Sequence, residues 1–176
     1  MNLTETDQIG LSPDAVADSF ASEVSGRRGS SGREPTDIDT LEGDATSVIV
    51  IRTPGRYVLS RHLRGARGRA GIRILADDVT LDLRGHALVG CEFSLDGLAL
   101  GDSVCNVRIA NGSVRSWGGV GADLAGAIRA RLENVRVFDN QGGALRLGPS
   151  ALLTDCVVGG DIKAGIEALE TEATAS

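Results

Sequence analysis

The sequence predicts an all-β fold in which short strands stack as successive coils, and three observations support it. A turn residue followed by alternating branched apolar residues recurs, with spacings of 28, 28 and 21 residues, at Asp78, Asn106, Asn134 and Asp155. Glycine opens an apolar strand in each unit, at Gly71, Gly97, Gly121, Gly143 and Gly165. The chain also has 24 glycines and only 3% aromatic residues, which disfavours long helices and indicates an aliphatic core. Repeats of this length are typical of solenoids, in which each unit packs on its neighbours.

Residues 1–46 precede the coils and are predicted to form a mobile, acidic arm. Ser12-Pro13-Asp14 is a helix-start pattern, and apolar residues follow at helical spacing from Val16 to Val24. This predicts a short amphipathic helix over about 13–24, too short to be stable unless it docks on something. Residues 25–40 are rich in Ser, Gly, Arg and acids, so they are predicted to be a disordered linker.

Order is expected to resume at residue 47, and the coils are expected to extend to residue 169. A strand at Val48–Ile51 and a second at Tyr57–Leu59 flank a Pro54-Gly55 turn, and a polar loop over 61–70 leads into the repeat. The last seven residues, 170–176, are a polar tail.

Within the repeat, the alternation of apolar and polar residues predicts which side chains face the core. The residues expected to point inward are Ile72, Ile74, Val79, Leu81, Leu83, Leu98, Leu100, Val107, Ile109, Val135 and Val137. Those expected to point outward are Arg73, Thr80, Asp82, Arg108 and Arg136.

The recurring turn residues have a structural explanation. Asn and Asp tolerate left-handed backbone geometry and form hydrogen bonds within tight turns. Stacked on successive coils, one such residue per coil would form a ladder along a single corner. The predicted ladder comprises Asp78, Asn106, Asn134 and Asp155.

Charge is distributed unevenly along the chain. Residues 1–50 carry ten acids and three arginines, whereas residues 51–90 carry eight arginines and three aspartates. An acidic arm beside a basic segment predicts either intramolecular pairing or contact with a polyanion. The formal net charge of −6 disfavours nucleic acid as that polyanion.

Cysteine usage and hydropathy limit the class of protein further. Cys91, Cys105 and Cys156 lack metal-ligand spacing and are interpreted as buried free thiols, so neither a metal nor another cofactor is expected. No apolar run approaches the roughly 18 residues of a membrane span, and Met1–Gly10 has no secretory pattern. We therefore expect a cytoplasmic protein without a membrane partner.

Few residues suggest chemistry. Asp82 and His86 have the side chains of an acid and a base, but both fall in a recurring bend, which favours a structural role. Asp96, Asp102 and Asp123 carry the oxygen ligands that Ca²⁺ prefers, although solvated turn acids are the favoured interpretation.

Arg115 and Trp117 form the one candidate ligand site. An exposed Trp beside an arginine is a natural platform for the face of a sugar, and Trp117 lies where a strand runs into a glycine loop. The competing interpretation, which is favoured, is that this single large ring covers the aliphatic coils.

Three segments carry a resemblance to a known family. They are Pro54-Gly55-Arg56-Tyr57-Val58-Leu59, the stretch from Gly71 to His86, and Asn106-Val107-Arg108-Ile109-Ala110-Asn111-Gly112. The chain resembles the right-handed parallel β-helix repeat family, the pectin-lyase-like fold, over about residues 47–160. The resemblance implies polysaccharide as the substrate class, but the same coils carry lyases, hydrolases, adhesins and phage spikes.

Together these observations predict a short single-stranded right-handed parallel β-helix of about five coils behind a mobile arm. The predicted function is a non-catalytic binding or assembly module, because no paired-carboxylate motif is visible and no lysine precedes Lys163 in the repeat. The alternative is a carbohydrate-active enzyme of the polysaccharide lyase or hydrolase type, truncated or degenerate. The expected partner is a second copy or another protein at an open end of the helix, or a polysaccharide.

Overall fold

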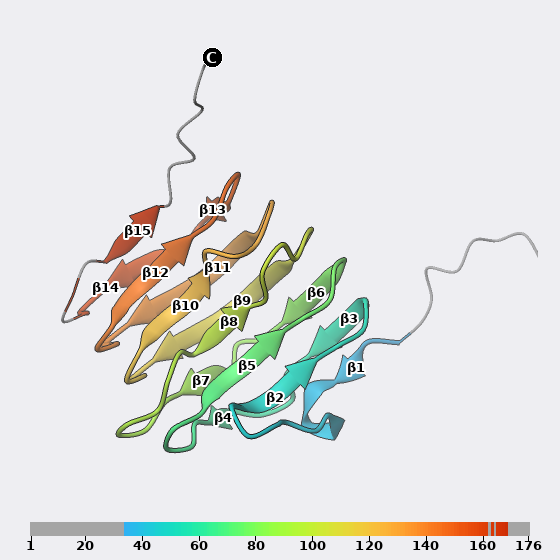
Figure 1. Ribbon diagram of the computed structural model, residues 1–176, viewed down its shortest axis with the longest axis horizontal. Coiled ribbons are helices and arrows are strands. Elements are labelled where there is room, and N and C mark those ends of the chain that lie inside the picture. The colour runs from blue at the N-terminus through green and yellow to red at the C-terminus, as the bar shows by residue number, and fades with distance from the viewer. Residues whose placement is uncertain (1–33, 162, 164, 169–176) are drawn as a thin grey trace, which may run out of the picture. The chain divides into compact units, whose positions relative to one another are not determined.

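The computed structural model describes residues 34–161, 163 and 165–168, which form an all-β parallel solenoid of about six turns (Figure 1). The helix predicted over 13–24 and the tail 170–176 lie outside the described residues, as does most of the predicted linker. The single helical element described is the 3-10 turn η2 (Ile38–Thr40). Within the described ranges, no helix has the length and apolarity needed to cross a membrane.

Two parallel sheets build the solenoid. The six-stranded sheet takes one strand from each turn and consists of β2 (Ser47–Ile51), β5 (Ala70–Ile74), β8 (Leu98–Leu100), β10 (Val120–Leu124), β12 (Gly143–Leu147) and β15 (Ile166–Ala168). The nine-stranded sheet consists of β1 (Thr36–Asp37), β3 (Gly55–Val58), β4 (Leu63–Arg64), β6 (Val79–Asp82), β7 (Ala87–Val89), β9 (Arg108–Arg115), β11 (Arg131–Phe138), β13 (Leu152–Thr154) and β14 (Val157–Gly159).

The nine-stranded sheet has two halves, so a full turn contains three straight segments. The first half of β9 pairs with β6 and its second half pairs with β7, and β11 pairs in the same way with β13 and β14. One turn therefore runs through the six-stranded sheet and then through both halves of the nine-stranded sheet. Three corners separate these segments.

The structure has about six turns where the sequence indicated about five. The first turn is formed by β2, β3 and β4, and β4 lies inside residues 61–70, which the sequence analysis interpreted as a polar loop. Leu63 of β4 is buried and pairs in register with Leu88 of the next turn. Leu63 alone, in a segment of arginines and glycines, is therefore enough to extend the core into the first turn.

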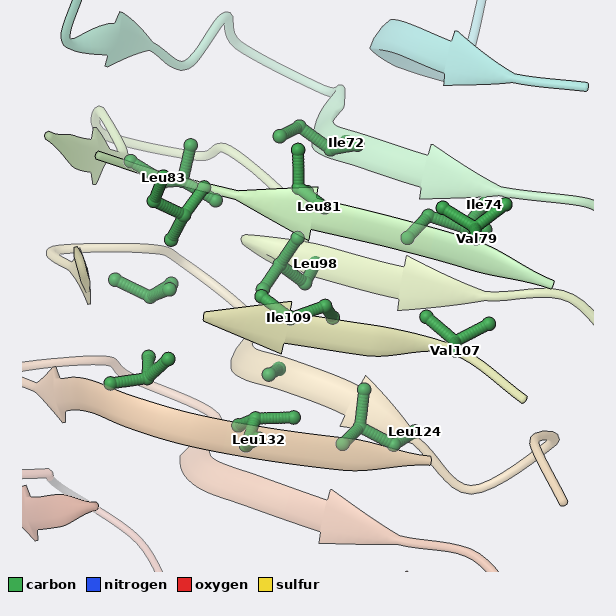
Figure 2. Packing of buried hydrophobic residues seen from close by; sticks show 14 of the residues in the cluster. Ile72, Ile74, Val79, Leu81, Leu83, Leu98, Val107, Ile109, Leu124 and Leu132 are labelled. Atoms are coloured by element: carbon green, nitrogen blue, oxygen red, sulfur yellow. The ribbon is translucent and has the colours of Figure 1, made fainter. Parts of the chain in front are cut away.

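The predicted inward and outward pattern is confirmed. Of the residues predicted to face the core, all are buried except Leu100, which is partly buried. In the six-stranded sheet, Ile72 lies beside Leu98, and in the nine-stranded sheet Leu81 lies beside Ile109, so like residues stack from turn to turn (Figure 2). Stacked branched aliphatic side chains therefore make up most of the core, in which Tyr57 and Trp117 are the aromatic members.

Residues 34–46 close the N-terminal end of the solenoid, although the sequence analysis assigned them to the arm. β1 pairs with β3, and Ile38 is fully buried in the core cluster. Asp37 accepts a hydrogen bond from the Asp39 N–H at 3.0 Å and another from the Ser60 hydroxyl. The Arg69 guanidinium donates to the carbonyl oxygens of Ser47, at 2.6 Å, and of Asp44. We call residues 34–46 the N-terminal cap.

Candidate functional surfaces

A left-handed residue marks the first corner, between the six-stranded sheet and the nine-stranded sheet. The residues of this corner have φ values of 53°, 56°, 59° and 58° and are Asp78, Asn106, Arg129 and Ser150. Strand register aligns them, because each lies two residues before a member of the paired set Thr80, Arg108, Arg131 and Leu152. The Asn106 Nδ2 donates to Asp78 Oδ1 at 3.0 Å and so links two turns.

The second corner separates the two halves of the nine-stranded sheet. Asn111, Asn134 and Asp155 adopt φ values of 58°, 52° and 52° there. Asn134 Nδ2 donates to Asn111 Oδ1 at 3.1 Å, and Asn111 Nδ2 donates to Asp82 Oδ1 at 3.1 Å. This corner therefore has a side-chain ladder of its own.

The structure corrects the single ladder predicted from the sequence. Asp78 and Asn106 stack in the first corner as expected, but Asn134 and Asp155 belong to the second corner. Both corners contain a left-handed residue that can be followed by an inward valine, so Asn106-Val107 and Asn134-Val135 look alike in sequence. Only the pairing of whole strands, which is not local, distinguishes them.

Trp117 is fully buried, which corrects its assignment as an exposed sugar platform. Its indole Nε1 donates to the Leu88 carbonyl oxygen at 3.2 Å, and its backbone N–H donates to Asn140 Oδ1 at 3.1 Å. The ring occupies space left by glycines, since a Cβ on Gly71 or Gly97 would come within 2.9 Å of it. The ring therefore fills the third corner, where the chain returns to the six-stranded sheet. This agrees with the interpretation of Trp117 as a ring that packs on the aliphatic coils.

Arg115 ends β9 on the outer surface of the nine-stranded sheet. It is half-buried, and it lies in register between Val89 and Phe138. Trp117 faces the core instead, so these two residues do not form a joint ligand surface.

The candidate acid and base both have structural surroundings. Asp82 Oδ1 accepts hydrogen bonds from the Arg84 N–H at 2.9 Å and from Asn111 Nδ2 at 3.1 Å, so this carboxylate holds the second corner. The His86 ring packs edge-on against the His62 ring, with 5.3 Å between the centroids. His62 Nδ1 accepts a hydrogen bond from the Ala87 N–H at 2.9 Å, a contact between residues 25 positions apart that no local pattern predicts.

The acids considered as calcium ligands have separate roles. Asp123 forms an ion pair with Arg146 at 2.7 Å, and Asp96 accepts a hydrogen bond from the Val120 N–H at 2.7 Å. Burial raises the pKa of Asp96, against the effect of that hydrogen bond. In the part of the chain that the structure describes, no group of three or more His, Cys, Asp or Glu side chains is arranged to hold a metal ion.

The three cysteines are free but are not buried as predicted. Cys91 is exposed, and Cys105 and Cys156 are partly exposed. The Sγ atoms of Cys105 and Cys156 lie 3.5 Å and 3.4 Å from the carbonyl oxygens of Ser103 and Thr154, two residues earlier in each case. Both thiols therefore contact corner backbone, but Cys156 also packs against the core cluster, so the predicted core position holds in part for that residue.

The last described turn presents an uncovered edge. β13 and β14 pair with β11, and β15 pairs with β12, while their opposite edges pair with no described strand. Leu152, Val157 and Ile166 of these three strands are 47%, 57% and 49% exposed. Figure 1 shows these strands at the end of the solenoid opposite β1. We call the edge formed by β13, β14 and β15 the C-terminal edge.

Comparisons with known proteins give no relative from which a function can be transferred: no family model, curated protein or solved structure matches this chain.

Proposed function

We propose that this protein is a non-catalytic assembly module that associates with a second copy of itself through the C-terminal edge. The open edge of β13, β14 and β15 carries this proposal, together with Ile166, which pairs in register with the buried Leu145 and is nevertheless 49% exposed. Open strand edges expose unpaired N–H and C=O groups and are templates for pairing with another chain.

The two ends of the solenoid differ, and the difference favours the C-terminal edge as the contact. At the other end, the N-terminal cap pairs with β3 through β1 and buries Ile38. At the C-terminal edge, large apolar side chains stand on strands that are paired on one side. Association would remove those side chains from water, and this burial stabilises the dimer by about 25 cal/mol per Å² of apolar surface.

A second copy suits this edge because the same surface can meet itself. Two identical edges related by a two-fold axis form a closed dimer. At the N-terminal end, by contrast, β1 covers β3 and Ile38 is buried, which leaves less apolar surface for a head-to-tail contact.

The test is sedimentation of the full-length protein over a range of concentrations. We expect a monomer–dimer equilibrium, and we expect Ile166→Lys to shift it to monomer, since Ile166 is at an inward register position and the substitution would bury an unpaired charge in the interface. Leu95→Lys is the matched control, because Leu95 is 46% exposed but lies in the corner loop between β7 and β8. This control variant is expected to dimerise like the wild type.

Two results would contradict the proposal. One is a monomer at every concentration with no change on substitution at the C-terminal edge. The other is a full-length monomer together with a dimeric chain that starts at Glu34, which would mean that residues 1–33 cover the edge in place of a second copy. Circular dichroism of each variant verifies that the fold is retained.

A further inference from the structure

We propose that the outer face of the nine-stranded sheet carries a binding site for one tetrahedral oxyanion, a phosphate or sulfate group. Arg56, Arg84 and Arg108 would form it around the Thr80 hydroxyl. This site is separate from the C-terminal edge and does not depend on the assembly proposed above.

Strand register brings these residues together although they are distant in sequence. Arg56 of β3 pairs with Thr80 of β6, and Thr80 pairs with Arg108 of β9. Neighbouring strands lie about 4.8 Å apart, so the two arginines stand about 9.6 Å apart with the threonine between them. Arg84 follows β6 at the second corner, with a φ of 48°.

A pocket lies over this group. It has a volume of about 110 Å³, and its lining includes Arg56, Thr80, Asp82, Arg84 and Arg108. A water molecule takes up about 30 Å³ in the liquid, so the pocket has room for a small ion and a few waters but not for a folded partner.

Much of the donor capacity of the lining is unused. Arg56 and Arg84 form no ion pair with any described residue, and the Thr80 hydroxyl has no hydrogen-bond partner among them. Arg108 donates to Glu133 through Nε, at 2.9 Å, and through one terminal nitrogen, which leaves its other terminal nitrogen free.

The charge balance of the pocket favours an anion. Three guanidinium groups line it, while Asp82 is the carboxylate of the lining and Glu133 pairs with Arg108 from outside it, so these two carboxylates leave one positive charge unbalanced. The Oδ1 of Asp82 already accepts hydrogen bonds from the Arg84 N–H and from Asn111 Nδ2, so this oxygen is occupied by the corner. The guanidinium groups are held close together without enough negative charge to neutralise them.

The arrangement of donors favours a tetrahedral group over a planar carboxylate. Arginine offers paired N–H donors that match the oxygens of phosphate and carboxylate groups. Here the donors approach from three places: β3, β9 and the corner after β6, with a hydroxyl in the middle. A carboxylate has two oxygens to share among them, whereas a phosphate or sulfate presents three or four.

Titration calorimetry of the full-length protein with inorganic phosphate and with sulfate tests the site, with chloride and acetate at matched ionic strength as reference anions. We expect saturable binding of phosphate and sulfate, and at least a tenfold loss of affinity in Arg56→Gln and in Arg84→Gln. Arg115→Gln is the matched control, since Arg115 lies on the same sheet outside the pocket and its replacement removes the same charge.

Equal binding of acetate, or an equal loss of affinity in Arg115→Gln, would overturn the proposal, because either would indicate a general response to charge. Absence of saturable phosphate and sulfate binding would also overturn it. Methyl phosphate distinguishes the source of the group: tighter binding than inorganic phosphate would assign a phosphate ester, and weaker binding would assign the free ion. Circular dichroism of each variant verifies the fold.

Discussion

At the scale of single residues, the corners depend on a few side chains that accept left-handed backbone geometry. Asn is suited to both the first and the second corner because its amide also links neighbouring turns, as Asn106 and Asn134 do. Arg129 occupies the same left-handed position with a φ of 59° and has no such side-chain amide. The predicted ladder therefore included the corner residues Asp78, Asn106, Asn134 and Asp155 and missed those at Asn111, Arg129 and Ser150.

Val135 is the residue at which the predicted inside and outside pattern is tested most directly. It is fully buried, so Val135→Asp would place an unpaired charge in the core. That costs several kcal/mol against a total stability of about 5–15 kcal/mol, and we expect the domain to unfold. Ile128→Asp, at a 41% exposed position in the loop before β11, is the control and should leave the thermal melt almost unchanged. A Val135→Asp variant that melts like the wild type would show that the register is incorrect.

Gly97 tests the close packing around Trp117. A Cβ at Gly97 would come within 2.5 Å of Val114 Cγ1 and of the Gly121 carbonyl oxygen. Gly97→Ala should therefore destabilise the protein by about 1–3 kcal/mol, measured by denaturant unfolding. Gly159→Ala is the matched control, because nothing lies within 4 Å of its Cβ position. Equal losses of stability in the two variants would contradict the packing described for the third corner.

At the scale of elements, the strands were largely predictable and the N-terminal cap was not. Strands at residues 71–74, 79–82 and 108–109 follow from alternation, because every second residue is branched and apolar. The cap has only Ile38 and Leu41 as large apolar residues in a polar stretch, and its hydrogen bonds to Ser60 and Arg69 come from the next turn. Composition describes a stretch only by its average. The order of the cap instead depends on two apolar residues and on hydrogen bonds with residues that are distant in sequence.

Asp44 gives the cap a dependence on pH. Hydrogen bonds from the Thr46 hydroxyl and from the N–H groups of Thr46 and Ser47 hold the pKa of this carboxyl below its ordinary value of 3.8. Because the folded-state pKa is lowered, the stabilisation is present above the unfolded pKa and is lost as the pH falls through the folded pKa. Asp44→Asn should lower the melting temperature at neutral pH, and the difference from wild type should shrink below about pH 4.

The control for Asp44 is Glu42→Gln, at an exposed carboxylate of the same segment. It is expected to melt like the wild type at neutral pH. A difference between Asp44→Asn and wild type that stays constant from neutral to acid pH would show that the charge of Asp44 does not matter to the cap.

At the scale of the whole molecule, residues 34–46 pack with the solenoid, although they precede residue 47, where the coils were predicted to begin. We expect a chain that starts at Glu34 to melt at a higher temperature than one that starts at Ser47, because the shorter chain exposes the surface that Ile38 covers. Loss of that one buried side chain costs about 2 kcal/mol. Equal melting temperatures would mean that the cap contributes nothing to stability.

The candidate site could be predicted only in part, because its residues belong to different turns. Alternation correctly placed Thr80 and Arg108 on the outside, but it gave no sign that Arg56 and Arg108 flank Thr80. The corner loops make successive turns unequal in length, with 28, 23 and 21 residues between Asp78, Asn106, Arg129 and Ser150. No fixed period along the sequence recovers the pairing across strands, so a site that spans several strands becomes visible only in the folded chain.

Because the two ends differ, local unfolding of the solenoid is expected to begin at the C-terminal edge. Each turn is held by its neighbours, and the turn formed by β13, β14 and β15 has a neighbour on one side among the described residues. In the monomer, amide hydrogen exchange should therefore be fastest in this turn and should slow progressively toward β5 and β6, which are paired on both sides. Raising the protein concentration should selectively slow exchange in β14 and β15 if two copies meet there, and leave the gradient through the other turns unchanged.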